Sequence, residues 1–400
     1  MHLHAFGNSR MLRKSDILSR RISFCCPFPK LGQRHSSNTT HPLEHTLKSI
    51  TKSFDAPITY AIGYGSGVFQ QEGYDKATAP QPMLDFLFAV DDPVRWHCHN
   101  INQNPHHYTS FTRSLLNLHP SLSNPLLNRL GAGVWFNSYV EINGFQCKYG
   151  VMGVETLWQD LKHWRTFYFA GRLQKPTNLI VDAMSSPLAD HNETNLLNAL
   201  RVALLLLPPV FTSTELWMAI TGLSYMGDFR TFVGGENPNK VRNIVSKQEQ
   251  LFESLYNPLL KKKFEALGSV TDLGIDGNGQ RRWEQIGEPG DRVRQFLLPL
   301  PEPFRSQIFS ALARRDPNVH APSNRWMMGL SAGWNELDPK DLEHLGRRTV
   351  TSDKLGDCVK EALVRTMFWP ALTQSAKGLL TVGISSSVRY ALEKLKKGRS

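Results

Sequence analysis

The chain has 400 residues, with 46 Lys and Arg against 35 Asp and Glu, and a formal net charge of +11. That length allows two or three domains with substantial cores, and the basic balance favours a polyanionic ligand: a nucleoside triphosphate, an anionic lipid or a nucleic acid. The longest apolar stretch, around 202–208, is far shorter than the ~20 residues that span a bilayer, so we expect no integral membrane protein. The five cysteines show no C-x-x-C spacing and indicate no disulfide framework.

The first 40 residues are basic and almost free of acids. Asp16 is the one acid, set against Arg10, Arg13, Lys14, Arg20, Arg21, Lys30 and Arg34. An Arg- and Ser-rich, acid-poor start is typical of a mitochondrial transit peptide. We therefore predict a transit peptide over 1–40, with a disordered basic tail as the alternative.

The next part of the chain mixes strand and helix patterns. β-branched and aromatic enrichment predicts strands, Asn143-Gly144 is a strong hairpin signal, and Asp91-Asp92-Pro93 fits a strand end followed by a helix start. In chain order we expect a helix over 41–56, strands over 57–64 and 83–90, a helix over 115–130, strands over 134–142 and 146–151, a helix over 154–169 and a strand over 179–181. Such a mixture favours an α/β core.

The rest of the chain reads as mainly helical. The polar segment 185–194 is predicted to be a linker, followed by helices over 195–207 and 214–220, the second capped by Thr212 or Ser213. Segments 268–291 and 316–324 are rich in polar and turn-forming residues and are predicted to be surface loops.

The sequence Gly65-Ser66-Gly67 directly follows the first predicted strand. Glycines let backbone N–H groups approach an anion closely, and Ser66 adds a hydroxyl, so the segment is a candidate phosphate cradle. The alternative is a tight turn without a ligand. In the next apolar run, Asp85 is embedded among apolar residues, where a carboxylate is costly unless it is paired or binds a metal. It is the best candidate ligand for Mg²⁺.

A second metal ligand is not obvious. Acids two residues apart on a strand lie ~6.6 Å apart and can share an ion, but position 87 is Leu. Asp91 lies six residues on, ~20 Å away on a regular strand. Asp182 is the other alternative, and the choice between the two stays open.

Six segments, in order, resemble the signature blocks of a known family: GYGSGVF, MLDFLFAVDDPVRWH, GAGVWFNS, KYGVMG, AGRLQKP and GLSYMGDFR, with weaker similarity to QSAKG at 374–378. The family is that of the mitochondrial phosphatidate cytidylyltransferases, also named mitochondrial translocator assembly and maintenance proteins. The resemblance implies an α/β nucleotidyltransferase-like mixed-sheet core, a smaller helical, winged-helix-like second domain and a C-terminal amphipathic helix. We expect the core over 41–185, the second domain over 195–330 and the C-terminal segment over 331–400.

The resemblance also implies an activity: CTP and phosphatidic acid give CDP-diacylglycerol and pyrophosphate, with Mg²⁺, for cardiolipin synthesis on the matrix side of the inner membrane. Besides Asp85 and Ser66, it favours Lys148 as a catalytic residue and Arg172 and Lys175 as phosphate contacts. The alternative for these three is solvated surface charge. Asp228 and Arg230 are either a structural ion pair or part of the site.

Two other functions remain open at this point: an RNA-directed nucleotidyltransferase, although no nucleic acid is expected as a partner, and a non-enzymatic assembly factor of the protein import machinery. The end of the chain suggests a partner of its own. Its apolar residues recur at helical spacing and basic residues surround them, which is typical of a helix lying on an anionic bilayer. The residues are Ile384, Val388, Leu392, Lys394, Lys396 and Lys397.

Overall fold

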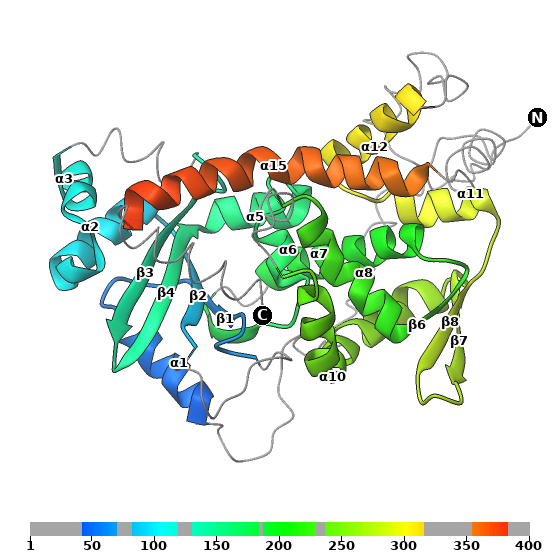
Figure 1. The fold of residues 1–400 in the computed structure, drawn as a ribbon, viewed down its shortest axis with the longest axis horizontal. Helices are drawn as coiled ribbons and strands as arrows, with labels where there is room; N and C mark the ends of the chain where they lie inside the picture. Colours follow the sequence, from blue (N-terminus) through cyan, green and yellow to red (C-terminus); the bar gives the residue numbers. More distant parts are fainter. Residues whose placement is uncertain are drawn as a thin grey trace, which may run out of the picture. The chain divides into compact units, whose positions relative to one another are not determined.

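The computed structural model describes residues 42–69, 82–118, 130–183, 187–228, 237–315 and 354–382, drawn as a ribbon in Figure 1. The predicted transit peptide, the loop at 316–324 and the amphipathic helix at 384–397 lie outside these residues. None of the described helices is long and apolar enough to cross a bilayer.

The first part of the chain forms a five-stranded mixed sheet in the order β3-β4-β2-β1-β5. β2 and β4 are parallel, and the other neighbours are antiparallel. The strands are β1 (Tyr60–Tyr64), β2 (Leu84–Val90), β3 (Val134–Ile142), β4 (Phe145–Gly153) and β5 (Asn178–Asp182). All five expected strands are therefore present. The turn between β3 and β4 is made by Asn143 and Gly144, both with positive φ (52° and 80°).

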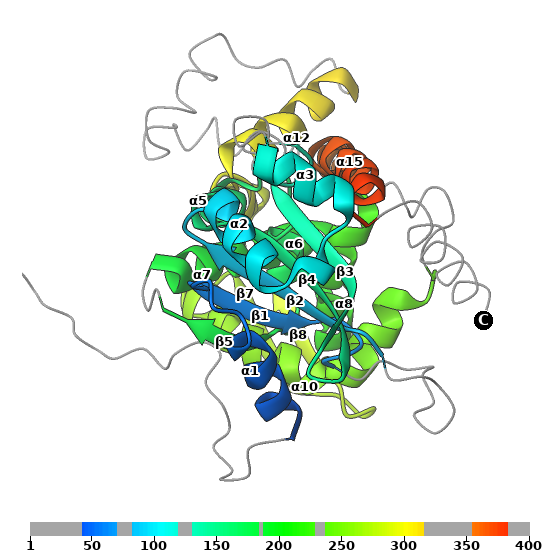
Figure 2. The same cartoon turned by 90° about the vertical axis from the view of Figure 1, so that its left-hand side faces the viewer.

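Helices cover both faces of this sheet. Successive side chains of a strand point to opposite faces, and here the side chains on each face are mostly apolar and need to be buried. One face packs against α1 (Pro42–Lys52) and α2 (Pro93–Gln103), which begins at the N-cap Asp92 as expected. The other carries Ile62, Leu87 and Met152 and packs against α5 (Val154–His163) and α6 (Ala170–Leu173). Figure 2 looks at the molecule from the side where the sheet lies. Asp85 lies two residues before Leu87 in β2, so its side chain is on the same face of the sheet, the one covered by α5 and α6.

The helix expected over 154–169 ends at His163, and this part of the prediction is wrong. Trp164 takes a left-handed conformation, and the Asp160 carboxylate accepts hydrogen bonds from the backbone N–H groups of the following loop. Its partners are Thr166 at 2.7 Å, Phe167 at 2.8 Å, Phe169 at 2.8 Å and Ala170 at 3.1 Å. One buried carboxylate thus ends the helix and fixes the loop that leads into α6.

The middle of the chain has the element order of a winged helix and confirms that part of the predicted fold. Its second helix starts with a capping box between Thr212 and Glu215, so Thr212, and not Ser213, is the cap of the two that the sequence offered. The three strands form a sheet in the order β6-β8-β7. The elements are α7 (Pro187–Leu206), β6 (Val210–Thr212), α8 (Ser213–Met226), α10 (Lys240–Leu260), β7 (Val270–Ile275) and β8 (Arg281–Gln285).

Two loop predictions in this region are wrong. The expected linker 185–194 is helical from Pro187 onward, because its polar residues occupy the first turns of α7, which continues into a buried apolar stretch. The expected loop 268–291 contains the β7–β8 hairpin. Its turn is held by Asp276, whose carboxylate accepts from the N–H groups of Asn278 and Gln280. Turn residues therefore obscured two short strands.

The last described helix, α15 (Leu355–Val382), packs against α12 (Glu302–Arg315) and extends to β3, as Figure 1 shows. Near its end, the Gln374 amide accepts from the N–H of Ala132 and donates to the carbonyl of Val134, both at 3.2 Å. One buried apolar cluster includes residues of the five-stranded sheet, the winged helix and α15. The remaining elements are α3 (Ser110–Leu118), the 3-10 helix η1 (Pro105–His107), the π-helices η2 (Lys261–Glu265) and η3 (Val293–Leu297), and α11 (Pro289–Arg292).

Candidate active site

The Gly65–Gly67 segment forms a tight turn at the end of β1. Gly65 has φ of 80°, and its carbonyl accepts from the N–H groups of Val68 (3.1 Å) and Phe69 (2.9 Å). A Cβ on Gly67 would lie 2.2 Å from the carbonyl oxygen of Met83, so backbone packing excludes any side chain there. Ser66 stands exposed between them. Within the described residues, no hydrogen bond uses the N–H groups of Ser66 and Gly67, which leaves them for a ligand.

Asp85 lies directly beside this turn. A Cβ on Gly65 would be 3.1 Å from an Asp85 carboxylate oxygen. In the sheet, Asp85 pairs with Tyr64 of β1 on one side and Lys148 of β4 on the other. The Lys148 ammonium is 3.8 Å from the carboxylate, and the two side chains are 20% and 24% exposed respectively. The structure therefore brings together the turn, the carboxylate and the lysine that the sequence singled out.

Arg172 and Lys175 extend this group with positive charge. The Arg172 guanidinium lies 3.7 Å from the ring centroid of Tyr168 and 5.9 Å from that of Tyr64. Burial and the Asp85 charge raise the pKa of Tyr64 to about 12, whereas Lys148 and Arg172 oppose the rise. Tyr64 therefore stays a neutral phenol, and these charges act on one another within a single site.

Lys175 is the most perturbed cation of the site. Its ammonium donates to Ser224 Oγ at 2.8 Å and to the carbonyl of Gly171. Burial first, and then the charges of Arg172 and Lys240, lower its pKa to about 7. Because the two neighbouring cations disfavour the ammonium form of Lys175, a bound anion would stabilise that form.

The winged helix supplies part of the site, through residues other than Asp228 and Arg230, for which the sequence had left this open. Lys175 lies 5.6 Å and Lys240 5.9 Å from the ring centroid of Tyr225, which is on α8, while Lys240 begins α10. Tyr225 belongs to the block GLSYMGDFR, but nothing in the sequence set Lys240 apart from other lysines. Asp228 is buried, and Arg230 lies outside the described residues.

The structure separates both alternative metal ligands from Asp85. Asp182 pairs with Tyr60, whereas Asp85 pairs with Tyr64, four residues or ~13 Å along β1. Asp91 follows the same distant end of β2 and accepts from the Thr59 hydroxyl at 3.0 Å. Two carboxylates that far apart cannot bind one ion. The idea that Asp91 or Asp182 completes the Asp85 site is therefore wrong for this conformation.

The Asp85 carboxylate fits a hard cation without a second protein ligand. It is partly exposed and adjoins the candidate phosphate cradle, and Mg²⁺ commonly uses one or two carboxylates, substrate phosphates and waters. In the part of the chain that the structure describes, no group of three or more His, Cys, Asp or Glu side chains is placed to hold a metal.

The histidines near residue 100 belong to a different environment. His97 and His107 are buried on the face of the sheet opposite Asp85, where their Nδ1 atoms lie 2.8 Å from Tyr108 Oη and 2.9 Å from Tyr149 Oη. Burial lowers the pKa of both, to about 3 and about 4. They are neutral members of a packed polar network.

A mixed sheet that combines a Gly-Ser-Gly turn, a neighbouring carboxylate and converging cations defines a nucleotidyltransferase-like protein. The comparisons with known proteins specify the family. The family described as "Phosphatidate cytidylyltransferase, mitochondrial" matches residues 47–397. The chain belongs to this family, which confirms the resemblance seen in the signature blocks.

Curated relatives carry the same name. The Schizosaccharomyces pombe protein is 35% identical over 358 residues, covering 89% of this chain and 84% of the relative. The Xenopus laevis protein is 37% identical over 351 residues, covering 88% and 94%. The Homo sapiens protein is 33% identical over 340 residues, covering 85% and 67%. Each is named a mitochondrial phosphatidate cytidylyltransferase.

Proposed function

We propose that this chain transfers the cytidylyl group of CTP to phosphatidate, forming CDP-diacylglycerol and pyrophosphate. The family and the names of the relatives support this reaction. The observation that carries it is the convergence of the Gly65–Gly67 turn, Asp85 and the three cations Lys148, Arg172 and Lys175 at one end of the sheet.

The proposed step is an in-line displacement at the α-phosphorus of CTP. A phosphate oxygen of phosphatidate forms the new P–O bond, and the bond to the bridging oxygen between the α- and β-phosphorus breaks, so pyrophosphate leaves with the electron pair. The lipid phosphate is already ionised near neutral pH, and no strong general base is needed. Positioning and charge stabilisation are therefore the main tasks of the protein.

The residues of the site match these tasks. The N–H groups of Ser66 and Gly67 and the Ser66 hydroxyl would donate to triphosphate oxygens, and Arg172 and Lys175 would neutralise the charge of the leaving pyrophosphate. Lys148, whose ammonium is 3.8 Å from the Asp85 carboxylate, would contact a phosphate bound beside Asp85. Asp85 would hold Mg²⁺, which supplies charge neutralisation on the triphosphate when bound.

We further propose that the protein works peripherally on the matrix side of the mitochondrial inner membrane, where its product would serve cardiolipin synthesis. The relatives are named mitochondrial, and the composition of residues 1–40 is that of a transit peptide.

One assay separates this function from its rivals. Purified protein is incubated with Mg²⁺, CTP labelled in the cytosine ring and phosphatidate liposomes, with RNA as the control acceptor. Label in a lipid extract as CDP-diacylglycerol supports the proposal, and label in RNA would favour a nucleotidyltransferase acting on nucleic acid. Label in neither acceptor, from folded protein that binds CTP, would contradict catalysis and favour an assembly factor.

A further inference from the structure

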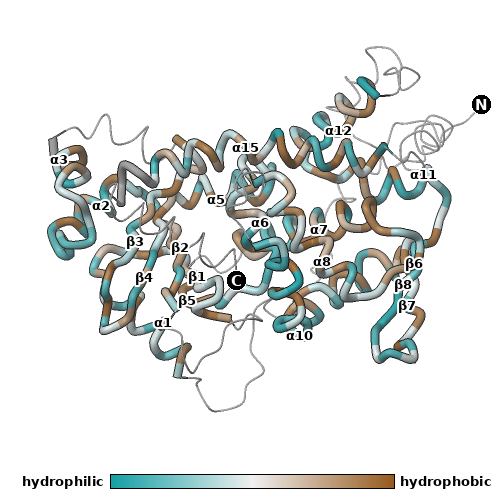
Figure 3. The backbone as a smooth tube through the Cα atoms, in the orientation of Figure 1, coloured by the Kyte–Doolittle hydropathy of each residue, from teal (hydrophilic) through white to brown (hydrophobic). Residues whose placement is uncertain are grey.

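One face of α15 carries an exposed tryptophan in line with charged residues. Glu361, Arg365 and Trp369 are spaced four residues apart and so lie in one stripe along the helix. The Trp369 side chain is 66% exposed, and Leu372, three residues further on, is only partly buried. Figure 3 shows apolar and polar residues alternating along α15, whose opposite face is buried in the core. The opposite face already packs α15 into the core, so Trp369, at 66% exposure, contributes little to that packing.

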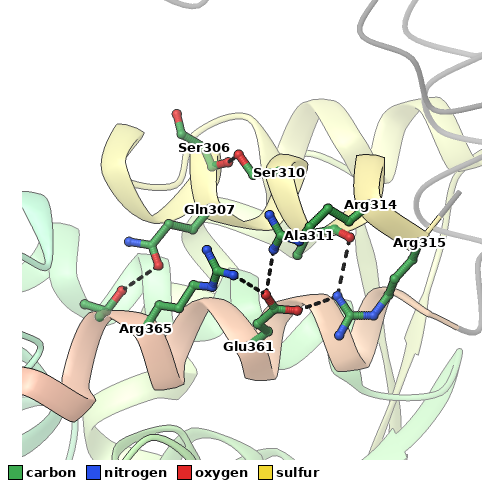
Figure 4. Close-up of polar contacts among 9 residues, drawn as sticks. Ser306, Gln307, Ser310, Ala311, Arg314, Arg315, Glu361 and Arg365 are labelled. Atoms are coloured by element: carbon green, nitrogen blue, oxygen red, sulfur yellow. Dashed lines mark hydrogen bonds and ion pairs between the residues drawn. The ribbon is translucent and has the colours of Figure 1, made fainter. Parts of the chain in front are cut away.

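An arginine cluster adjoins the stripe at the junction of α12 and α15. Figure 4 shows Arg314 and Arg315 of α12 and Arg365 of α15 pointing at the carboxylate of Glu361. Guanidinium nitrogens of Arg314, Arg315 and Arg365 lie 2.6 Å, 2.5 Å and 2.9 Å, respectively, from carboxylate oxygens of Glu361. Three guanidinium groups face the Glu361 carboxylate, and Asp357 adds a second negative charge that acts on Arg315, so this group keeps an excess of one positive charge. Arg314 is 46% and Arg365 is 52% exposed, so both keep N–H donors that face solvent.

The chemistry of this surface restricts what can cover it. An indole is at once apolar and a hydrogen-bond donor and is enriched where hydrocarbon meets head groups. Excess guanidinium charge beside it selects an anionic surface, and bidentate N–H pairs match phosphate oxygens. In the sequence, the basic segment 384–397 follows α15, and its pattern of apolar and basic residues predicts a membrane-surface helix.

We propose that the stripe of Arg365, Trp369 and Leu372, together with Arg314, docks onto an anionic lipid bilayer. Trp369 and Leu372 enter the head-group boundary, and the two arginines contact lipid phosphates. The surface adds a fixed contact to whatever the segment 384–397 contributes, and it orients the folded domains toward the membrane. This inference rests on the proposed function only for the reason why the protein needs a bilayer.

The test measures partitioning of the full-length protein onto vesicles by flotation. The vesicles contain phosphatidylcholine with phosphatidylglycerol, an anionic lipid that is not the proposed substrate. Trp369→Ala should weaken partitioning by about tenfold or more, since an aromatic side chain buries a large area. The double change Arg314→Gln and Arg365→Gln should weaken it by about fivefold per charge, and only on the anionic vesicles.

A matched control is Ile275→Ala on β7, because Ile275 is equally exposed at 66% but belongs to the wing hairpin. It should partition like the wild type. Equal partitioning of wild type, Trp369→Ala and the arginine variant would overturn the proposal, as would an equal loss in the Ile275 control. If Trp369→Ala left flotation unchanged but dissociated an oligomer in size-exclusion chromatography, the stripe would be a contact between copies of this chain instead.

A second measurement does not depend on truncating a side chain to alanine. Lipids brominated in the upper acyl chain should quench part of the tryptophan fluorescence of the wild type and less of that of Trp369→Phe. Equal quenching in both proteins would contradict insertion of Trp369. Activity on a short-chain phosphatidate dissolved below its micelle concentration should be the same in wild type and Trp369→Ala. If neither protein showed this activity, the proposed reaction would be contradicted, but the flotation result would still be valid.

Discussion

The lowered pKa of Lys175 predicts how CTP binding depends on pH. In the free protein its pKa is about 7, because burial and the charges of Arg172 and Lys240 disfavour the ammonium. A bound triphosphate places negative charge beside it and reverses that balance, so binding favours the protonated lysine. Between about pH 6 and about pH 8 the protonated fraction in the free protein falls about tenfold. If binding requires the ammonium, CTP affinity should fall by the same factor as the pH rises.

Isothermal calorimetry with CTP and Mg²⁺ measures this directly. Near pH 8 the wild type should take up close to one proton per CTP bound, seen as a difference in binding heat between buffers with different ionisation enthalpies. Lys175→Met should bind CTP more weakly and without this uptake, and Lys175→Arg should keep its charge throughout the range. Titration of the γ-phosphate of CTP is common to all three proteins and cancels in the comparison. The same pH dependence in wild type and Lys175→Met would refute the reasoning.

Four further predictions test the site and the targeting segment. Asp85→Asn keeps the volume of the side chain and removes its charge, so cytidylyl transfer should be abolished while the thermal unfolding midpoint changes little; near-normal turnover would exclude Asp85 as the metal ligand. Gly65→Val should nearly eliminate CTP binding in calorimetry, because a β-branched residue at φ of 80° is strained and its Cβ would meet the Asp85 carboxylate. Lys240→Met should weaken CTP binding by about tenfold, as expected for a lost charged contact, whereas Lys247→Met, two turns along α10 and exposed, should not; equal effects would remove Lys240 from the site. Deleting residues 2–40 should leave catalysis intact and prevent protection from protease in isolated mitochondria, and a protected truncated protein would contradict the transit peptide.

The sheet and its central carboxylate were predictable because their signals are local. β-branched and aromatic runs mark β1 and β2, and Asn143-Gly144 marks the hairpin. The Gly-Ser-Gly turn and Asp85 stood out for the same reason: each breaks an apolar pattern within a few residues. The strand register that places Asp85 between Tyr64 and Lys148 could not be predicted from the sequence. It nevertheless brings together Asp85 and Lys148, which the sequence analysis had both selected.

Other parts of the site have no local signal. Lys240 is one lysine among many until α10 packs against α8 and brings it to Tyr225. The exclusion of Asp91 and Asp182 needed the strand pairing, because the sequence does not show which strands are neighbours or in which register they pair. The early end of α5 also needed the tertiary structure, because Asp160 stabilises the loop through backbone contacts that no side-chain pattern reveals.

The contacts around α6 explain why a winged helix accompanies this site. Asn195 of α7 accepts at 2.9 Å from both the Trp164 indole and the Gln174 amide, and donates to the carbonyl of Ala170 at 3.1 Å. The Tyr256 hydroxyl of α10 donates to the carbonyl of Gln174 at 2.7 Å. These contacts hold the chain on either side of Arg172 and directly before Lys175.

The Arg172 and Lys175 side chains carry like charges that repel each other, and this repulsion would favour their separation if the backbone were free. The winged helix holds that backbone through Asn195 at Ala170 and Tyr256 at Gln174, and Ser224 accepts a hydrogen bond from the Lys175 side chain. Binding energy from the triphosphate is then not consumed in ordering the loop. The winged helix therefore has a role in this chain that requires no nucleic acid: it holds the cationic side of the site against the sheet that carries Asp85.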